Sequence, residues 1–500
     1  MERRIIMAGL LQEEINWTRT ENGALTYTST GSPCLDLFAS IGALRHSPKR
    51  EILRLFQAAY GENRDLALKT LFFARDIRGG LGERRVFRII FHWLALFAPE
   101  AAEKNLPLVP DYGRYDDLLE LLGTPCEKQA VSFFQQKLEA DERSAKEGQP
   151  VSLLAKWLPS VNASCTRTVN QARHLARQFH LTEREYRQLL TGLRREIHLL
   201  ENHLRNRDYT FAYDRQPSKA LFKYRQAFWR NDGERYQAFL DQVEKGEKKL
   251  HTGTLAPYDI VAPLVENNGF WERPAQPLTE EQRRSLDVTW NAQEDFTRGE
   301  NALVVADGSG SMYGGSHPLP AAVAQSLAVY FAERNRGPFR NRFITFSEHP
   351  RLVEIKGRDI AEKIQYTMSF NEVANTDLQG VFDLLLREAV RKRMTQEELP
   401  QRLYVISDME FDAACCRGEG TNFQRAREKF RAQGYELPQV IFWNVDSRTR
   451  QQPVTQNQQG AVLVSGCSPQ IFQMIREGNL DPMAFMLEVL GQERYRPVGA

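Results

Sequence analysis

The chain reads Ala-Leu-Val-Val-Ala-Asp-Gly-Ser-Gly-Ser from residue 302 to residue 311. An apolar run that stops at a glycine-rich turn is typical of a buried strand followed by a loop. The loop carries one carboxylate, Asp307, and two hydroxyls, Ser309 and Ser311, on alternate residues. Such oxygen donors form half of a site for a hard cation, and the intervening glycines let the loop turn tightly. The stretch therefore predicts a strand and a candidate metal loop together.

Two further oxygen donors lie downstream in a pattern of alternating strands and helices. Thr376 precedes a helix-periodic segment, and Asp408 ends a second apolar run. The pattern predicts strands at 302–306, 342–346, 351–355, 402–408, 439–444 and 461–465, and helices at 317–334, 359–367, 378–393, 421–433 and 468–477. Such alternation predicts a doubly wound, mostly parallel sheet with helices on both faces. Ligands of these sheets bind beyond the carboxyl ends of the strands, where Asp307 and Asp408 stand.

The first half of the chain has a helical pattern instead. From about residue 36 to residue 250, apolar residues recur at helical spacing, with breaks at 79–80, 107–113, 148–150, 159 and 217. A polar stretch at 270–300 precedes the first strand. Because 500 residues exceed the size at which one core keeps growing, we expect two domains. They are a helical array at 1–290 and a sheet domain at 291–500.

Composition limits the classes of partner. The 66 Lys and Arg residues nearly balance the 64 Asp and Glu residues, so any polyanion-binding surface must be local. Six cysteines without CxxC spacing indicate reduced thiols and argue against a disulfide scaffold or a zinc ribbon. No segment reaches the roughly 18 uncharged apolar residues of a membrane span. We expect a cytoplasmic protein without a membrane partner.

The carboxylate and hydroxyl donors favour a divalent cation, and we expect Mg²⁺, with Mn²⁺ and Ca²⁺ accepting the same ligands. An open coordination position could take a carboxylate of an acidic protein partner. The alternatives are a plain Gly/Ser turn and a phosphate-binding loop. Tyr313 stands where a dinucleotide loop needs its third glycine, and no Gly-Lys-Ser/Thr is present, so the phosphate-binding alternative is weak.

With these residues, the second half of the chain resembles von Willebrand factor A domains that carry a metal-ion-dependent adhesion site. The resemblance implies that the ligands are Asp307, Ser309, Ser311, Thr376 and Asp408. Many members have a glycine after the last aspartate, whereas Met409 and Glu410 follow it here. This departure leaves the backbone shape of the loop open and makes Glu410 a candidate neighbour of the ion.

Two stretches of the helical half carry candidate RNA contacts. Residues 74–85 form a glycine-rich break with arginines, which can clamp phosphates or can cap a helix and pair with Asp76 and Glu83. Residues 203–230 hold seven cations against two anions, interleaved with aromatic residues, which suits single-stranded RNA. The alternative is an amphipathic helix with solvated cations and core aromatics, and Phe222, Phe228 and Trp229 are expected in the core either way. The candidate contacts are Arg75, Arg78, Arg84, Arg85, Arg205, Arg207, Lys219, Lys223, Tyr224, Arg225 and Arg230.

The order of the two halves resembles the Ro autoantigen family. In that family, HEAT-like helical repeats close into a ring that binds RNA ends in its hole and structured small RNAs outside it. Residues 74–85, 111–118, 155–160 and 254–258 are similar to signatures of an uncharacterised Ro-like, TROVE-related family. The resemblance spans nearly the whole chain. It implies a helical array, possible closure into a ring, and RNA as the partner.

These observations favour a Ro-like RNA-binding protein whose A domain holds a divalent metal. The alternative is a metal-dependent protein–protein interaction scaffold without RNA binding. An enzyme is the third candidate, and we expect none, because nucleophile-elbow, HExxH and phosphate-loop motifs are missing from the sequence.

Overall fold

The structure is a computed structural model that describes residues 16–266, 277–297, 299–314, 317–371, 376–411, 421–446, 451–475 and 481–500. Its α-helices are α2 (Pro33–Ser40), α3 (Lys49–Glu62), α4 (Arg64–Arg75), α5 (Arg84–Phe97), α6 (Pro99–Asn105), α7 (Val109–Tyr112), α8 (Glu127–Lys146), α9 (Leu154–Trp157), α10 (Thr166–Gln178), α11 (Glu183–Glu196), α12 (Leu200–Arg205), α13 (Ser218–Glu244), α14 (Pro257–Glu266), α15 (Glu280–Asn291), α16 (Pro320–Arg334), α17 (Ile360–Met368), α18 (Leu378–Lys392), α19 (Asn422–Ala432), α20 (Ile471–Met474) and α21 (Pro482–Leu490). The 3₁₀ helices are η1 (Ile41–His46), η2 (Leu106–Leu108), η3 (Tyr115–Leu121), η4 (Tyr213–Arg215), η5 (Gly310–Tyr313) and η6 (Glu493–Tyr495). The strands are β1 (Trp17–Arg19), β2 (Leu25–Tyr27), β3 (Ala302–Asp307), β4 (Arg342–Phe346), β5 (Leu352–Glu354), β6 (Arg402–Ser407), β7 (Gln439–Asn444) and β8 (Ala461–Ser465).

The expected fold class is confirmed. A helical region runs from α2 to α15, and a six-stranded sheet with the order β5-β4-β3-β6-β7-β8 follows it. The sheet is parallel except for β5, which is antiparallel to β4 at one edge. All six predicted strands are present, and each predicted helix between them is found, although α20 is shorter than expected. The short pair β1–β2 and the helices α15 and α21 were not predicted.

The central strands β3, β6 and β7 are apolar in their middle because both faces of the sheet are buried there. Along β3, Ala302, Val304 and Ala306 belong to the core cluster on the α16 face, while Leu303 and Val305 belong to the cluster on the α18–α19 face. All six residues of β3 are buried. A parallel sheet covered on both sides reads as a continuous apolar run, which is the pattern that opens the domain in sequence.

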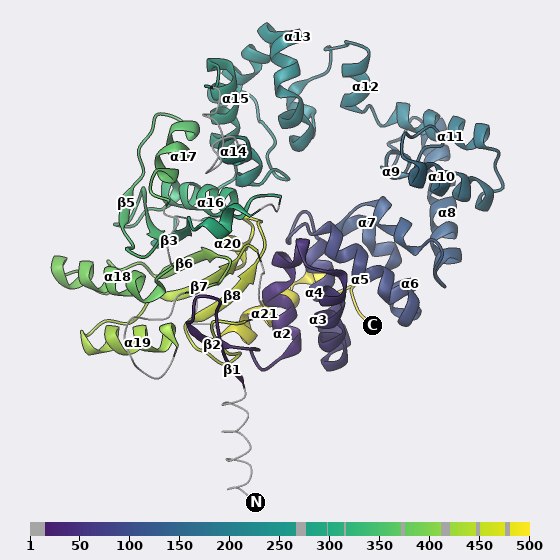
Figure 1. Ribbon diagram of the computed structural model, residues 1–500. Helices are drawn as coiled ribbons and strands as arrows, with labels where there is room; N and C mark the ends of the chain where they lie inside the picture. The colour runs from purple at the N-terminus through teal and green to yellow at the C-terminus, as the bar shows by residue number, and fades with distance from the viewer. Residues whose placement is uncertain are drawn as a thin grey trace, which may run out of the picture.

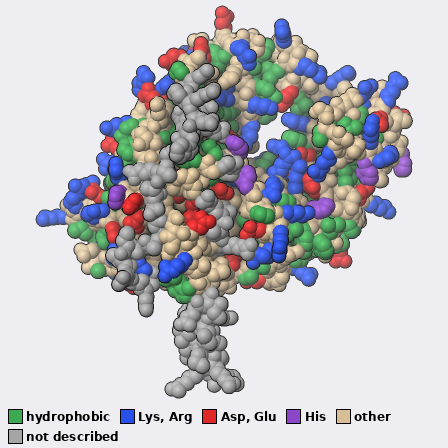
Figure 2. All heavy atoms as spheres, in the orientation of Figure 1, with side chains coloured by type: hydrophobic (Ala, Val, Ile, Leu, Met, Phe, Trp, Pro, Cys, Tyr) green, Lys and Arg blue, Asp and Glu red, His purple; other side chains and the backbone are tan. Residues whose placement is uncertain are grey.

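The helical region closes into a ring through the sheet domain. At its start, α2 contacts β8 and α21, and α4 contacts α21; at its end, α14 contacts α16 and α17, and α15 contacts α17. The helices α8 to α13 span the distance between these two anchors (Figure 1). Figure 2 shows the molecule hollowed between the helical arc and the sheet domain, with Lys, Arg and His side chains on the rim. This ring includes the sheet domain, whereas the family resemblance implied closure of the helical repeats themselves.

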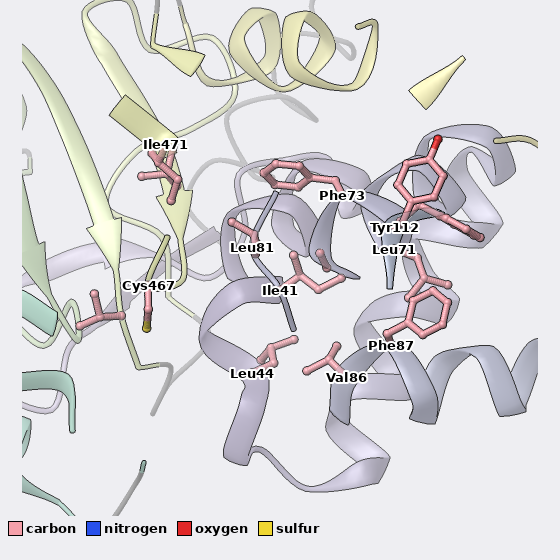
Figure 3. Close-up of a cluster of buried hydrophobic side chains, with 14 of the residues drawn as sticks. Ile41, Leu44, Leu71, Phe73, Leu81, Val86, Phe87, Tyr112, Cys467 and Ile471 are labelled. Atoms are coloured by element: carbon pink, nitrogen blue, oxygen red, sulfur yellow. The ribbon is translucent and has the colours of Figure 1, made fainter. Parts of the chain in front are cut away.

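One hydrophobic core joins the start of the helical region to the sheet. Figure 3 shows Cys467 and Ile471, which follow β8, on the side of the cluster that faces Leu81 and Phe73 of the helical region. The backbones also approach closely, since a Cβ at Gly42 would lie 2.6 Å from the carbonyl oxygen of Ser465. The Gly42 amide donates a hydrogen bond to Ser465 Oγ at 3.0 Å. Glycine is required at position 42 because η1 lies directly on the end of β8.

Both ends of the described chain pack on the half that is remote in sequence. Tyr27 of β2 pairs with Gln452 of the sheet domain in an antiparallel bridge. At the other end, both Arg494 and Tyr495 reach the buried Asp76 carboxylate after α4, Tyr495 through its hydroxyl at 3.1 Å. The domain boundary at residue 290 stays a prediction.

None of the described helices combines the length and the apolar character that a membrane crossing requires. Cys34, Cys126, Cys165 and Cys467 are free thiols. Cys415 and Cys416, which the sequence presents as an adjacent pair, lie outside the described residues.

Candidate metal centre and candidate nucleic-acid interface

The first candidate metal loop follows β3, as predicted. Asp307 is fully buried, and its Oδ1 accepts a hydrogen bond from the Ser309 amide at 2.9 Å. The hydroxyl oxygens of Ser309 and Ser311 lie 2.9 Å apart. A Cβ at Gly308 would lie 2.3 Å from Asn371 Oδ1, so a side chain there would displace Asn371. The loop therefore gathers one carboxylate and two hydroxyls at the carboxyl end of the central strand.

The third loop follows the neighbouring strand β6 and is bonded to the first. Ser407 Oγ donates to Asp307 Oδ2 at 2.6 Å and accepts from the Met409 amide at 3.1 Å. Met409 has a φ of +68°, the left-handed conformation that favours glycine. The glycine-like backbone shape left open by the sequence is therefore kept, with a buried methionine in place of glycine.

The second loop joins both others. Thr376 Oγ1 donates to the Glu410 carbonyl oxygen at 2.9 Å, which lies two residues beyond Asp408. Asn371, at the start of this loop, donates to the Tyr313 hydroxyl and accepts from Gln325 Nε2 at 3.0 Å. Residues 372–375 lie outside the described residues. The three predicted loops thus meet at one edge of the sheet through side-chain hydrogen bonds between residues that are far apart in sequence.

The donor set fits a hard divalent cation. Burial, and then the neighbouring charge of Asp408, raise the pKa of the Asp307 carboxyl above its usual range. Two adjacent buried carboxylates cost free energy, which a divalent cation offsets. Among the described residues, no three His, Cys, Asp or Glu side chains form a metal-binding group. The remaining ligands would therefore be the hydroxyls, as in the predicted set.

Glu410 is engaged elsewhere. Its Oε2 accepts from the Glu21 amide at 2.9 Å and from Gln451 Nε2 at 2.7 Å, and its carbonyl oxygen accepts from Asn22 Nδ2 at 2.8 Å. The β1–β2 hairpin therefore covers the third loop. No pattern in the sequence predicts this contact, because Glu21 and Glu410 are 389 residues apart.

One predicted RNA contact is wrong. Arg75 is 1% exposed, and its Nε donates to Asp117 Oδ2 at 2.7 Å. Its partner is neither Asp76, which bonds Arg494, nor Glu83, which pairs with Arg45. A guanidinium enclosed in this way stabilises the join between α4 and η3 and cannot reach a nucleic acid. Arg78 is exposed, with Nη1 donating to the Asp111 carbonyl oxygen at 3.3 Å.

Arg84 and Arg85 are exposed on α5 and line a pocket of about 600 Å³. Their neighbours in this pocket include Lys49 of α3, Arg88 of α5 and Arg167 of α10. Lys49 and Arg167 were not predicted as candidates, because only the fold brings α3 and α10 to α5. Arg88 could have been found, since it lies one helical turn after Arg84.

In the second basic stretch, residues 203–230, three expected core aromatics are buried or half-buried and five candidate cations are exposed. Phe228 is buried, Phe222 and Trp229 are half-buried in hydrophobic clusters, and Trp229 Nε1 donates to Ser285 Oγ at 2.5 Å. These three aromatics are core, as expected. The cations Arg205, Arg207, Lys219, Lys223 and Arg230 are exposed.

Three of the candidates in this stretch have close partners. Lys219 pairs with Asp259 at 3.1 Å. The Arg225 guanidinium lies 4.0 Å from the centre of the Phe222 ring, and burial lowers the pKa of Arg225. Lys223 Nζ lies 5.0 Å from the centre of the half-buried Tyr224 ring. None of Arg205, Arg207, Lys223 and Arg230 pairs with a carboxylate among the described residues, so their charge faces solvent.

Family models match both halves of the chain. A model described as "Domain of unknown function (DUF2828)" matches residues 20–146 and 128–295, and a model described as "Domain of unknown function (DUF7788)" matches residues 301–489. The chain is 28% identical to "Uncharacterized protein L728" of Acanthamoeba polyphaga mimivirus, over 97% of this chain and 89% of that protein. The crystal structure of the Deinococcus radiodurans Ro (RSR) protein aligns with a TM-score of 0.42 and 16% identity, over 92% of this chain and 93% of that chain.

Proposed function

Because the chain belongs to the family described as "Domain of unknown function (DUF2828)", we propose its function from the chemistry of its own residues: it is a non-enzymatic, cytoplasmic, Ro-like RNA-binding protein. The helical ring holds the RNA, and the sheet domain carries a divalent cation, Mg²⁺ in the first place. The exposed cations of α12 and α13 carry this proposal. Arg205, Arg207, Lys223 and Arg230 present positive charge that no described carboxylate offsets, and Lys223 lies next to the Tyr224 ring.

Cations beside an aromatic face suit single-stranded RNA. Each guanidinium or ammonium can neutralise a phosphate, while an aromatic ring can stack on an unpaired base. The chain as a whole has a net charge of only +2, so nonspecific attraction by the whole molecule is small. Binding would therefore depend on these local cations, which makes the proposal testable with few substitutions.

The test measures the affinity of the full chain for a short, fluorescein-labelled single-stranded RNA by fluorescence anisotropy across a salt series. The double variant Lys223→Gln/Arg230→Gln should bind more weakly, and the slope of log affinity against log salt should fall by about 0.7 for each lost phosphate contact. The matched control is Arg387→Gln/Arg431→Gln, which removes two exposed cations from α18 and α19 of the sheet domain. RNA binding that is absent at low salt, or equal in the two double variants, would refute the proposal.

The candidate metal centre supports a second function, a metal-dependent scaffold that binds an acidic protein partner. Its support is the pair of adjacent carboxylates Asp307 and Asp408 beside the hydroxyls of Ser309 and Ser311. A carboxylate from a partner could complete the coordination of the cation. A pull-down with and without chelator, comparing the wild type with Asp307→Ala, tests this function. Loss of a protein partner while RNA binding persists would favour the scaffold, and identical partners under all conditions would exclude it.

A further inference from the structure

A pocket between α3, α5, η3 and α10 has a strongly basic lining. Its volume is about 600 Å³. Five of its lining side chains are cations, and they come from three helices: Lys49, Arg84, Arg85, Arg88 and Arg167. Only one lining residue, Glu120, is acidic. The fold therefore gathers positive charge here from segments far apart in sequence.

Part of this charge is offset, and the remainder is not. Arg84 Nη2 lies 2.6 Å from Asp116 Oδ2, and Arg88 Nε lies 2.7 Å from Asp117 Oδ1. With Glu120, these carboxylates number three against five lining cations, which leaves an excess of two positive charges among these groups. Lys49 and Arg167 form no ion pair with a described residue, and both are exposed. The excess charge is thus carried by side chains that are free to bind an anion.

The arginines of α5 are held in place before any ligand arrives. Arg85 Nη1 donates to the carbonyl oxygens of Arg45 at 2.9 Å and Ser47 at 2.8 Å. The buried carboxylates of Asp116 and Asp117 form ion pairs with Arg84 and Arg88, and these pairs orient both guanidinium groups. A guanidinium that is already oriented loses less conformational entropy when it binds an oxyanion.

We propose that this pocket binds the terminal phosphate monoester of a nucleotide, supplied either by a free nucleotide or by the 5′ end of an RNA. A phosphate monoester carries about −1.5 to −2 charges at neutral pH, which matches the excess of the pocket. Arginine forks bind phosphate oxygens bidentately, and the ammonium of Lys49 adds a point charge.

The rest of the pocket suits the nucleoside. A volume of about 600 Å³ lies within the range of small-molecule sites and exceeds what a phosphate group fills. Ile89 and His92 lie one turn apart on α5 and offer a surface on which a base can pack. The His92 ring is oriented by its Nδ1, which donates to the Glu120 carbonyl oxygen at 2.8 Å. The Glu120 carboxylate can accept an amino or imino proton of the base.

The test uses the full chain in two arms. In the first, calorimetry compares guanosine 5′-monophosphate with guanosine and with inorganic phosphate. In the second, anisotropy compares two labelled single-stranded RNAs of one sequence, one with a 5′-phosphate and one with a 5′-hydroxyl. The second arm rests on the RNA binding proposed above, whereas the first does not.

The pocket variants are Lys49→Gln and Arg167→Gln, which remove exposed cations that form no ion pair with a described residue. The matched control is Arg177→Gln, an exposed arginine at the other end of α10. We expect the phosphorylated probe to bind at least about tenfold more tightly than its unphosphorylated counterpart in one or both arms. Each pocket variant should remove most of this preference, and the control should keep it. Thermal unfolding of every variant checks that the fold is intact.

The outcomes separate the two proposals. A preference confined to guanosine monophosphate identifies a free nucleotide as the ligand, and a preference confined to RNA identifies its 5′ end. RNA that binds equally with either end, together with equal binding of guanosine and its monophosphate, overturns the pocket proposal and leaves RNA binding by the ring intact. A preference for phosphate that both pocket variants retain also overturns it.

Discussion

Replacing Met409 with alanine and, separately, with glycine tests the backbone of the third metal loop. Both changes remove a buried side chain, 4% exposed, from the core cluster on the α18–α19 face. Each should therefore destabilise the protein by about 2–5 kcal/mol. Only alanine keeps the steric penalty of a left-handed residue, about 1–2 kcal/mol, while glycine loses about 0.5–1 kcal/mol of additional conformational entropy on folding. The glycine variant should be the more stable of the two by roughly 1 kcal/mol.

Met486 provides the matched control. It is fully buried but lies within the helix α21, where an ordinary helical backbone is required. At this position the order should reverse, because glycine in a helix is about 1 kcal/mol less favourable than alanine. At each position the alanine and glycine variants leave nearly the same cavity. The sign of the stability difference between them therefore does not depend on the size of that cavity, and the two signs can be compared.

Thermal unfolding measured by differential scanning fluorimetry resolves these differences. If the sheet domain unfolds as a unit of about 200 residues, 1 kcal/mol corresponds to a shift in Tm of about 2–4 °C. The Tm of Met409→Gly should exceed that of Met409→Ala by this amount, and the Met486 pair should differ in the opposite sense. If alanine is equal to or better than glycine at position 409, the left-handed residue in this loop is refuted.

Three other perturbations give outcomes that the structure specifies. Gly42→Ala would place a Cβ 2.6 Å from the Ser465 carbonyl oxygen and should lower the Tm of the protein. As a control, Gly192→Ala in α11, where a Cβ would have no neighbouring atom within 4 Å, should stabilise the protein by about 1 kcal/mol. Equal Tm values of the two variants in calorimetry would contradict the close approach of η1 to β8. Arg75→Met should lower the free energy of unfolding, measured with urea, by about 3 kcal/mol. This is the lower end for a broken buried ion pair, because Asp117 still pairs with Arg88. The RNA affinity of the folded protein should be unchanged. Weaker RNA binding by a folded Arg75→Met variant would show that its burial is described wrongly. Mg²⁺ should raise the Tm of the wild type but not of Asp307→Asn, and a chelator should reverse the gain; a shift of equal size in both proteins would place the cation elsewhere.

The sheet domain could be predicted closely because its buried strands leave a strong pattern. The apolar run at 302–306 and the one at 402–408 each stop at an aspartate, and parallel strands place those ends at one edge. The helix at 378–392 carries its apolar residues on one face, which packs on the sheet. In these segments local propensity and tertiary environment agree, so the pattern sufficed.

The elements that were missed are held by partners remote in sequence or hidden by polar composition. The strands β1 and β2 have three residues each, too few for a visible alternation, and they depend on Gln452. The helix α15 is polar, but Thr279 and Gln282 form a capping box that the sequence displays at the right spacing. That signal could have identified the helix inside the polar stretch at 270–300.

The candidate sites show the same division. The five candidate metal ligands follow from residue type and position, yet their loops are tied together by Ser407 and Asn371, which no motif marks. Arg75 was misplaced because its partner Asp117 is 42 residues away. The sequence pattern around a basic residue is the same whether the side chain faces RNA or a buried carboxylate. Only the fold distinguishes these two environments.

During synthesis on the ribosome, the carboxylate of Asp76 is made long before its partner Arg494. Its partner Arg494 lies 418 residues later, so α4 emerges long before the side chains that neutralise Asp76 exist. At translation rates of about 5–20 residues per second, the interval is roughly 20–80 seconds. During that time the first helices have an unpaired acid and an apolar face that the sheet domain has yet to cover. A nascent chain of this protein must therefore be kept from aggregating for most of its own translation.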